Sequence, residues 1–263
     1  MSENRKKAIL VVSFGTSHHD TCQATITAIE KEIQAAFPEF PLYRAWTSKI
    51  IIRKLWERDH VHIDTVQEAL EKMHRDGITD VLVQPTHVIN GIENDQMKED
   101  ILSFGKYFQS VSFGDPLLTS EQDSLDVIQA IADEFSYLKE DQALVLMGHG
   151  TTHFSNSIYA ALDYTFKDKG YPNIFIGTVE AYPSIETLLK MIKVYRPSKV
   201  FLAPFMIVAG DHAKNDLAGA DPDSWYCQFR STGYEAEPVL KGLGEYPGIR
   251  KILVKHLARL NAR

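Results

Sequence analysis

The chain contains two related stretches of sequence, and this internal repeat limits the folds that it can adopt. Residues 81–93 align without a gap with residues 200–212, each position lying 119 residues before its counterpart. A second pair of stretches, residues 9–16 and residues 144–151, aligns with an offset of 135 residues. We therefore expect two related halves that share one order of strands and helices.

The two copies differ in the residues that carry chemistry. Glu93 in the first copy aligns with His212 in the second, and Phe14 aligns with His149. Both histidines therefore belong to the second half. The sequence predicts a symmetric scaffold that carries one asymmetric site.

Length and composition fit two globular domains. The chain has 263 residues, enough for two domains of about 130 residues, each with a sizeable core. Hydrophobic residues make up 44% and charged residues 24%, and no segment has the roughly 18 consecutive apolar residues of a membrane span. The short apolar run near the N-terminus does not resemble a signal peptide. We expect a cytoplasmic protein that does not bind membranes.

Charge and cysteine content exclude further classes of protein. The formal net charge of −7 argues against nucleic-acid binding, which depends on neutralising phosphates with Lys and Arg. Cys22 and Cys227 lie far apart and form no Cys-x-x-Cys pair. Neither a disulfide framework nor a thiolate metal site is indicated.

Strand-like and helix-like segments alternate along the whole chain, which is typical of βαβ units and a mainly parallel sheet. The expected strands are residues 8–14, 42–47, 81–86, 111–113, 144–147, 174–179 and 200–204. The expected helices are residues 26–37, 64–77, 124–135, 157–169 and 184–195, with a last one that begins at Pro247. The predicted fold class is α/β, with two similar lobes, each a mainly parallel sheet flanked by helices, and a cleft between them.

The polar stretch 139–142 is the best candidate for a boundary between the lobes. We therefore expect an N-terminal lobe of residues 1–138 and a C-terminal lobe of residues 139–263. The helix at 124–135 would link them.

Three side chains of the second half follow predicted strands. His149 lies between two glycines directly after one strand, Glu180 closes the next, and His212 lies in a long polar segment after a third. Ligands of open parallel sheets bind at the carboxyl ends of strands, so we expect these side chains to converge. Two imidazoles and a carboxylate suit a first-row divalent ion such as Co²⁺, Ni²⁺, Fe²⁺ or Zn²⁺. The plainer alternative is a set of solvated loop residues.

Other polar residues are candidates for the remaining roles. Glu93, at the position of His212 in the first half, is a candidate proton acceptor, and His87 is either a second acceptor or a packed loop residue. Lys49, Arg53 and Lys214 are candidates for pairing with an anionic substrate, although a solvated helix face is the favoured interpretation for any one of them.

Five blocks of the sequence resemble the sirohydrochlorin cobaltochelatases (CbiK) of the class II chelatase family. The resemblance runs nearly from end to end, and the blocks occur in the family's order and spacing. They are residues 7–17, 84–93, 146–151, 177–180 and 203–216.

The resemblance implies a two-lobed chelatase that inserts Co²⁺ into the tetrapyrrole sirohydrochlorin without ATP and without an organic cofactor. By position, His149 and His212 match the family's paired metal-binding histidines, and Glu180 matches the acidic residue that completes the metal site. Glu93 matches a carboxylate of the cleft that assists with substrate or protons. The implied catalytic residues are His149, Glu93 and His212.

Alternatives remain open at this point. The protein could carry a metal or a tetrapyrrole without turnover, or it could be a chelatase for Fe²⁺ or Ni²⁺. A hydrolase or phosphatase is disfavoured because the chain has no Gly-x-Ser-x-Gly elbow and no P-loop lysine. Assembly into a homo-oligomer is also left open by the sequence.

Overall fold

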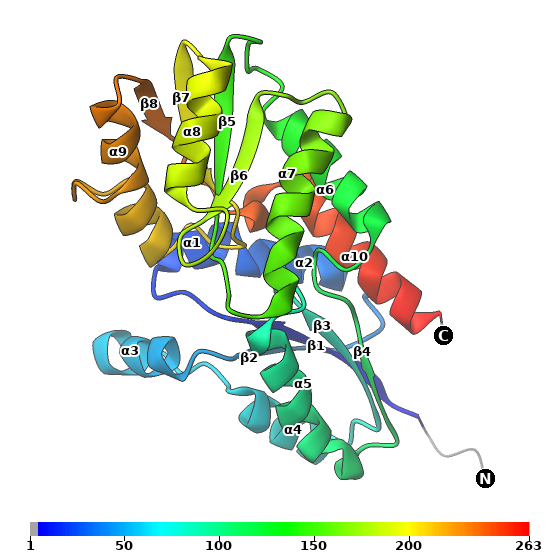
Figure 1. Ribbon diagram of the computed structural model, residues 1–263. Helices are drawn as coiled ribbons and strands as arrows, with labels where there is room; N and C mark the ends of the chain where they lie inside the picture. Colours follow the sequence, from blue (N-terminus) through cyan, green and yellow to red (C-terminus); the bar gives the residue numbers. More distant parts are fainter. Residues whose placement is uncertain (1–4, 263) are drawn as a thin grey trace. The chain divides into compact units, whose positions relative to one another are not determined.

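A computed structural model of the protein describes residues 5–262 and divides the chain into two compact units (Figure 1). Unit 1 comprises the described residues up to Thr119 and those from Ile249 onward, and unit 2 runs from Ser120 to Gly248. Each unit contains a four-stranded sheet in which every pair of neighbouring strands is parallel. The expected fold class of two similar α/β halves is confirmed.

The sheet of unit 1 has the strand order β2-β1-β3-β4. Its strands are β1 (Lys7–Ser13), β2 (Leu42–Trp46), β3 (Asp80–Pro85) and β4 (Ser110–Phe113). Its helices are α1 (His19–Ala24), α2 (Ile26–Ala36), α3 (Lys49–Asp59), α4 (Val66–Arg75), α5 (Ile92–Ser103), the 3₁₀ turn η1 (Gly105–Tyr107) and nearly all of α10 (Pro247–Asn261).

The sheet of unit 2 repeats this arrangement with the order β6-β5-β7-β8. Its strands are β5 (Gln142–Gly148), β6 (Ile174–Thr178), β7 (Lys199–Pro204) and β8 (Glu235–Pro238). Its helices are α6 (Glu121–Glu134), α7 (Ser157–Asp168), α8 (Ile185–Tyr195), α9 (Trp225–Ser231), the π-helix η3 (Ala213–Leu217) and the 3₁₀ turns η2 (Phe154–Asn156) and η4 (Leu243–Glu245).

The sequence repeat reappears as an identical strand register in the two sheets. Lys7 of β1 is paired with Asp80 of β3, and Gln142 of β5 is paired with Lys199 of β7. The offsets from unit 1 to unit 2 are 135 for the first member of each pair and 119 for the second, the same offsets that align the sequences. The two copies of the repeat therefore occupy matching places in matching sheets.

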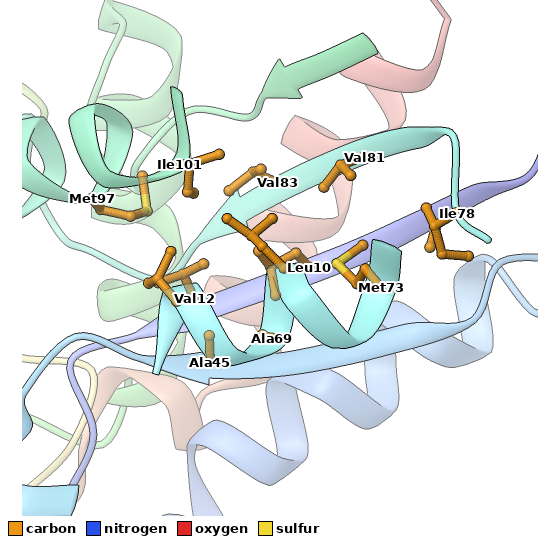
Figure 2. Close-up of a cluster of buried hydrophobic side chains, with 13 residues drawn as sticks. Leu10, Val12, Ala45, Ala69, Met73, Ile78, Val81, Val83, Met97 and Ile101 are labelled. Carbon is orange, nitrogen blue, oxygen red and sulfur yellow. The ribbon is translucent and has the colours of Figure 1, made fainter. Parts of the chain in front are cut away.

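The central strand of each sheet is buried on both faces. Every residue from Ala8 to Val12 in β1 is 0% exposed, as expected for a continuous apolar run in a parallel sheet. Figure 2 shows the cluster on one face of the unit 1 sheet, to which α4 contributes Ala69 and Met73, α5 contributes Met97 and Ile101, and the strands contribute Leu10, Val12, Val81 and Val83. Burying an aliphatic side chain of this size contributes about 1.5–3 kcal/mol. The sheets are therefore rigid supports for the loops at their strand ends.

The units differ from the expected lobes at both ends of the second half. The expected boundary at 138/139 places α6 in the first lobe and α10 in the second, whereas the structure groups α6 with unit 2 and α10 from Ile249 onward with unit 1. The contacts explain this: Arg250 bonds Glu32 at 2.6 Å in unit 1, while Lys241 bonds Glu134 of α6 at 3.2 Å in unit 2. A polar stretch in the sequence marks a loop, but it does not show with which sheet the preceding helix packs.

Several helices were not expected from the sequence. α3 buries only Leu55, and α5 buries the polar Asn94 together with Met97 and Ile101, so neither shows a clear apolar stripe. The segment after β7, expected to be irregular, contains the π-helix η3. Among the described residues, no helix combines the length and the apolar character needed to cross a membrane.

Candidate metal centre

The three candidate ligands lie at the carboxyl ends of three neighbouring strands in unit 2. His149 directly follows β5, the strand between β6 and β7. Glu180 lies two residues beyond the end of β6, and His212 directly precedes the π-helix η3. One donor atom of each side chain lies within 4.8 Å of the other two. The structure thus brings together the residues that the sequence singled out, and we call this group the candidate metal centre.

The distances suit a single small ion. His149 Nε2 lies 3.7 Å from Glu180 Oε1, and the rings of His149 and His212 meet edge to face with centroids 4.7 Å apart. Two donors that each bind a tetrahedral ion at about 2.1 Å are about 3.4 Å apart, so the His149–Glu180 pair needs little adjustment. The three side chains are 42%, 54% and 39% exposed in the order His149, Glu180, His212. They are therefore accessible to an incoming ion.

Hydrogen bonds fix which imidazole nitrogen faces the other ligands. His149 Nδ1 bonds the carbonyl oxygen of Gly150 at 2.8 Å, and His212 Nδ1 bonds Asp216 Oδ2 at 2.6 Å. Both acceptors require a proton on Nδ1, so Nε2 carries the free lone pair in each neutral ring. Such partners orient metal-binding histidines and raise their basicity.

The two glycines beside His149 are needed for different reasons. Gly150 has a φ of +89°, and a Cβ there would lie 2.9 Å from the Ala181 nitrogen. Gly148 has no such backbone conformation, but a Cβ there would lie 2.5 Å from the ring of Tyr159. Backbone freedom is therefore the reason for glycine only at position 150. Gly148 instead allows a helix side chain to pack against the strand end.

A π-helix positions His212 and its acidic partner. The Lys214 N–H donates to the Gly210 carbonyl at 3.0 Å, and the π-helical turn that follows places Asp216 against the His212 ring. Single turns of π-helix occur frequently at functional sites. Sequence reasoning did not identify Asp216, and its four-residue spacing from His212 was the only signal.

Unit 1 has different side chains at the three matching positions, namely Phe14, Ser48 and Glu93. The backbone confirms the match, because the Ser48 N–H donates to the Phe14 carbonyl at 3.2 Å just as the Glu180 N–H donates to the His149 carbonyl at 2.9 Å. The two imidazoles of the candidate metal centre therefore belong to unit 2, and unit 1 has a phenylalanine and a glutamate at their positions.

Comparison with known proteins identifies the family. The family model described as cobalt chelatase (CbiK) matches residues 7–261 of this chain. The chain belongs to the CbiK family. A sirohydrochlorin cobaltochelatase of Salmonella typhimurium is 42% identical over 252 residues, which cover 96% of this chain and 95% of the relative. The sirohydrochlorin cobaltochelatase CbiKC of Nitratidesulfovibrio vulgaris is 33% identical over 258 residues, covering 96% and 89%.

Solved structures of other chelatases share the fold of this CbiK-family chain. SirB from Bacillus subtilis, determined with Fe³⁺, superposes with a TM-score of 0.67 at 13% identity, covering 98% of this chain and 96% of SirB. CbiX, described as the terminal enzyme of siroheme biosynthesis in denitrifying bacteria, gives a TM-score of 0.53 at 13% identity, covering 96% and 98%. At such low identity these structures support the two-sheet architecture and nothing finer.

The candidate proton acceptors of this CbiK-family chain lie in unit 1. Glu93 is exposed in the first turn of α5, where the helix dipole favours a carboxylate. Both ring nitrogens of His87 are buried, and desolvation by this burial lowers the pKa of His87. His87 is therefore held in its neutral form. The placement of Glu93 opposite the metal centre stays a prediction.

The candidate basic residues of the CbiK-family chain are spread over two helical segments. Lys49 is the first residue of α3, and Arg53 on the same helix lies 3.9 Å from Glu57. Lys214 lies in the π-helix of unit 2. Contact of these residues with an anionic substrate stays a prediction.

Proposed function

We propose that this protein is a cobaltochelatase that inserts Co²⁺ into sirohydrochlorin without ATP. Two relatives with more than 30% identity over nearly the whole chain carry the name sirohydrochlorin cobaltochelatase. The observation that carries the proposal is the convergence of His149, Glu180 and His212 on one point at the sheet edge. A chelatase must hold a metal that it later gives up, and this cluster is suited to that task.

The metal is a substrate of the proposed reaction. His149 and His212 bind Co²⁺ through Nε2, and Glu180 supplies a carboxylate oxygen that offsets part of its charge. Three protein ligands leave coordination positions open, and the incoming pyrrole nitrogens can occupy them. The same donors accept Ni²⁺ and Fe²⁺, so preference among these ions depends on geometry and supply.

Two protons must leave for each metal that enters. The macrocycle loses two pyrrole N–H protons as Co²⁺ binds its four nitrogens, and no atom changes its oxidation state. Glu93, or a histidine released from the metal, accepts these protons. No covalent intermediate between protein and substrate is required.

The test replaces each histidine of the metal centre separately. His149→Ala and His212→Ala should each lower cobalt insertion by more than about 100-fold, because loss of even an outer partner of a metal ligand costs about 10–100-fold. Insertion is followed anaerobically by the absorption of sirohydrochlorin with Co²⁺, Ni²⁺ and Fe²⁺ in turn. His74→Ala, which alters an exposed histidine on α4, is the matched control.

Two results would contradict the proposal. If both variants inserted cobalt at nearly the rate of the unaltered protein, His149 and His212 would not be the metal ligands of the reaction. Binding of one equivalent of metal or sirohydrochlorin without turnover would favour a carrier, which needs the same ligands but no proton acceptor.

A further inference from the structure

Unit 1 contains a second group of metal-ligating side chains at the start of α4. His62, Asp64 and Glu68 each offer a donor atom, and these atoms all lie within 4.8 Å of one another. His62 Nε2 is 3.2 Å from Asp64 Oδ1 and 3.8 Å from Glu68 Oε1. We call these three residues the His62 cluster, and none of them belongs to the candidate metal centre.

A helix cap holds the Glu68 carboxylate in place, and a backbone hydrogen bond holds the segment that carries Asp64. Glu68 Oε2 accepts hydrogen bonds from the Thr65 N–H and hydroxyl, both at 2.8 Å, so Glu68 Oε1 is the oxygen left to face His62. The Asp64 carbonyl accepts the Trp46 N–H at 3.0 Å, which ties this segment to the end of β2. The Glu68 carboxylate and the Asp64 backbone are therefore positioned by contacts outside the cluster.

The donor set matches a first-row divalent ion. One neutral imidazole and two carboxylates provide mixed nitrogen and oxygen ligands with a net charge of −2, and water can fill the remaining positions. Lys72 Nζ lies 3.7 Å from Asp64 Oδ2, a loose contact that a bound cation would replace. Ion pairs this exposed contribute little to the free energy of unfolding. The close approach of these three side chains is therefore not explained by a gain in stability.

We propose that His62, Asp64 and Glu68 form a second binding site for a divalent transition metal such as Co²⁺, Ni²⁺ or Zn²⁺. This site goes beyond the proposed chelatase reaction and does not depend on it. Three ligands from one exposed loop and helix turn should give a reversible site whose ion exchanges with solvent.

A tryptophan beside the cluster provides a direct signal of binding. The Trp56 ring lies edge to face with His62, at 6.5 Å between ring centroids, and 53% of this tryptophan is exposed. Open-shell ions such as Co²⁺ and Ni²⁺ quench indole fluorescence at this range, whereas Zn²⁺ does not. Zn²⁺ should therefore bind without quenching and should prevent quenching by Co²⁺.

The experiment uses the full chain with the metal centre disabled by His149→Ala and His212→Ala. Equilibrium dialysis against Co²⁺ should find one bound ion per chain, and Co²⁺ should quench the Trp56 signal. Adding Trp56→Phe should remove the quenching and leave the bound ion. Adding His62→Ala should weaken binding at least about tenfold, the smallest loss expected for a metal-site residue.

Three further variants make the outcome specific. Glu68→Gln keeps an acceptor for the Thr65 cap but removes the charge, so it should weaken binding without loss of fold. Lys72→Ala removes the competing cation and should tighten binding. His74→Ala, on the same helix with its ring against Tyr107, should change nothing.

Either of two results would overturn this proposal. One is the absence of a bound ion in the disabled background at millimolar Co²⁺. The other is binding that His62→Ala and His74→Ala affect equally. Neither result bears on the chelatase assay, which tests residues of unit 2.

Discussion

Asp216 is the residue through which the fold controls His212. Its carboxylate accepts a hydrogen bond from His212 Nδ1–H at 2.6 Å, while His149 Nδ1–H donates to a backbone carbonyl instead. A carbonyl cannot be removed by substitution, but a carboxylate can. Asp216 therefore allows the role of imidazole orientation to be tested without loss of a ligand.

We expect Asp216→Asn to lower the affinity for Co²⁺ by about 10–100-fold, because the amide is a weaker acceptor and allows the ring to rotate. Affinity is measured by isothermal titration with Co²⁺, and the rate of insertion is measured in parallel. Asp223→Asn, which changes an exposed carboxylate seven positions later, serves as control. Equal affinities for the two variants would show that Asp216 does not orient the ligand.

Burial of His87 makes the stability of unit 1 depend on pH. The pKa of His87 is lowered from its ordinary value of 6.5, with desolvation as the main cause, so the unfolded chain binds its proton more readily than the folded chain. Above pH 6.5 the protonation of His87 does not reduce the free energy of unfolding. As the pH drops from 6.5 toward the folded pKa, the free energy of unfolding falls by up to about 1.4 kcal/mol per pH unit. Below the folded pKa the loss is constant.

Urea unfolding at pH 7.5, 6.5 and 5.5 measures this dependence. The His87→Gln variant cannot titrate at this position, so its free energy of unfolding should vary less between pH 7.5 and 5.5 than that of the unaltered protein. Parallel curves for the two proteins would show that His87 is not the group responsible.

The convergence of His149, Glu180 and His212 was predictable from sequence because the ends of buried strands can be recognised in it. Continuous apolar runs mark β5 and β7, and a parallel sheet gathers the residues that follow them at one edge. Asp216 was not predictable in the same way, since its contact with His212 depends on a π-helical turn. The His62 cluster was missed because its residues precede and begin a helix, where acidic residues are common.

At the scale of elements, burial decides which helices the sequence reveals. α4 buries Val66, Ala69, Leu70 and Met73 on one stripe, and the sequence predicted this helix. α3 was missed because it buries Leu55 alone. The strands of both sheets were predicted except β8, whose four residues alternate between exposed and half-buried.

A capping box begins α6, the first element of unit 2. The Ser120 hydroxyl accepts the Asp123 N–H at 3.2 Å, and Asp123 Oδ2 accepts the Ser120 N–H at 2.9 Å. We expect Ser120→Ala to lower the free energy of unfolding by about 1 kcal/mol, because the hydroxyl satisfies an otherwise unpaired N–H.

Urea denaturation followed by circular dichroism measures that loss. Gln122→Ala is the control. Gln122 lies in the same turn, but its side-chain amide bonds Asp126 further along the helix and takes no part in the capping box. A loss for Gln122→Ala as large as that for Ser120→Ala would assign the effect to general helix propensity.

At the scale of the whole molecule, the chain passes between the units twice. It leaves unit 1 after Thr119, forms unit 2, and returns at Ile249 to complete unit 1. The sequence repeat predicts two halves but cannot show this return, because α6 and α10 have similar amphipathic patterns and either could pack on either sheet. Long-range contacts settle it: Lys7 bonds Asn261 at 2.8 Å, and His256 bonds the Asp115 carbonyl at 3.1 Å.

The return of α10 predicts an unequal response to truncation after Gly248. The deletion removes five aliphatic side chains that are at most 9% exposed, namely Ile249, Ile252, Leu253, Leu257 and Leu260. Burial of each side chain contributes about 1.5–3 kcal/mol. Together the five contribute as much as the net stability of a typical domain, which is about 5–15 kcal/mol. Unit 1 should therefore unfold, while unit 2 retains its sheet and the candidate metal centre.

Hydrogen exchange read by mass spectrometry distinguishes the units in the truncated protein. Peptides from β1 and β3 should lose protection, whereas peptides from β5 and β7 should keep it, and one Co²⁺ should still bind in a manner that depends on His149 and His212. A matched full-length variant, Leu257→Ala, should weaken protection in unit 1 alone, since a large-to-small change in a core costs about 2–5 kcal/mol. Uniform loss of protection in both units would mean that they unfold together. The two units would then differ in their contacts but would not be independently stable domains.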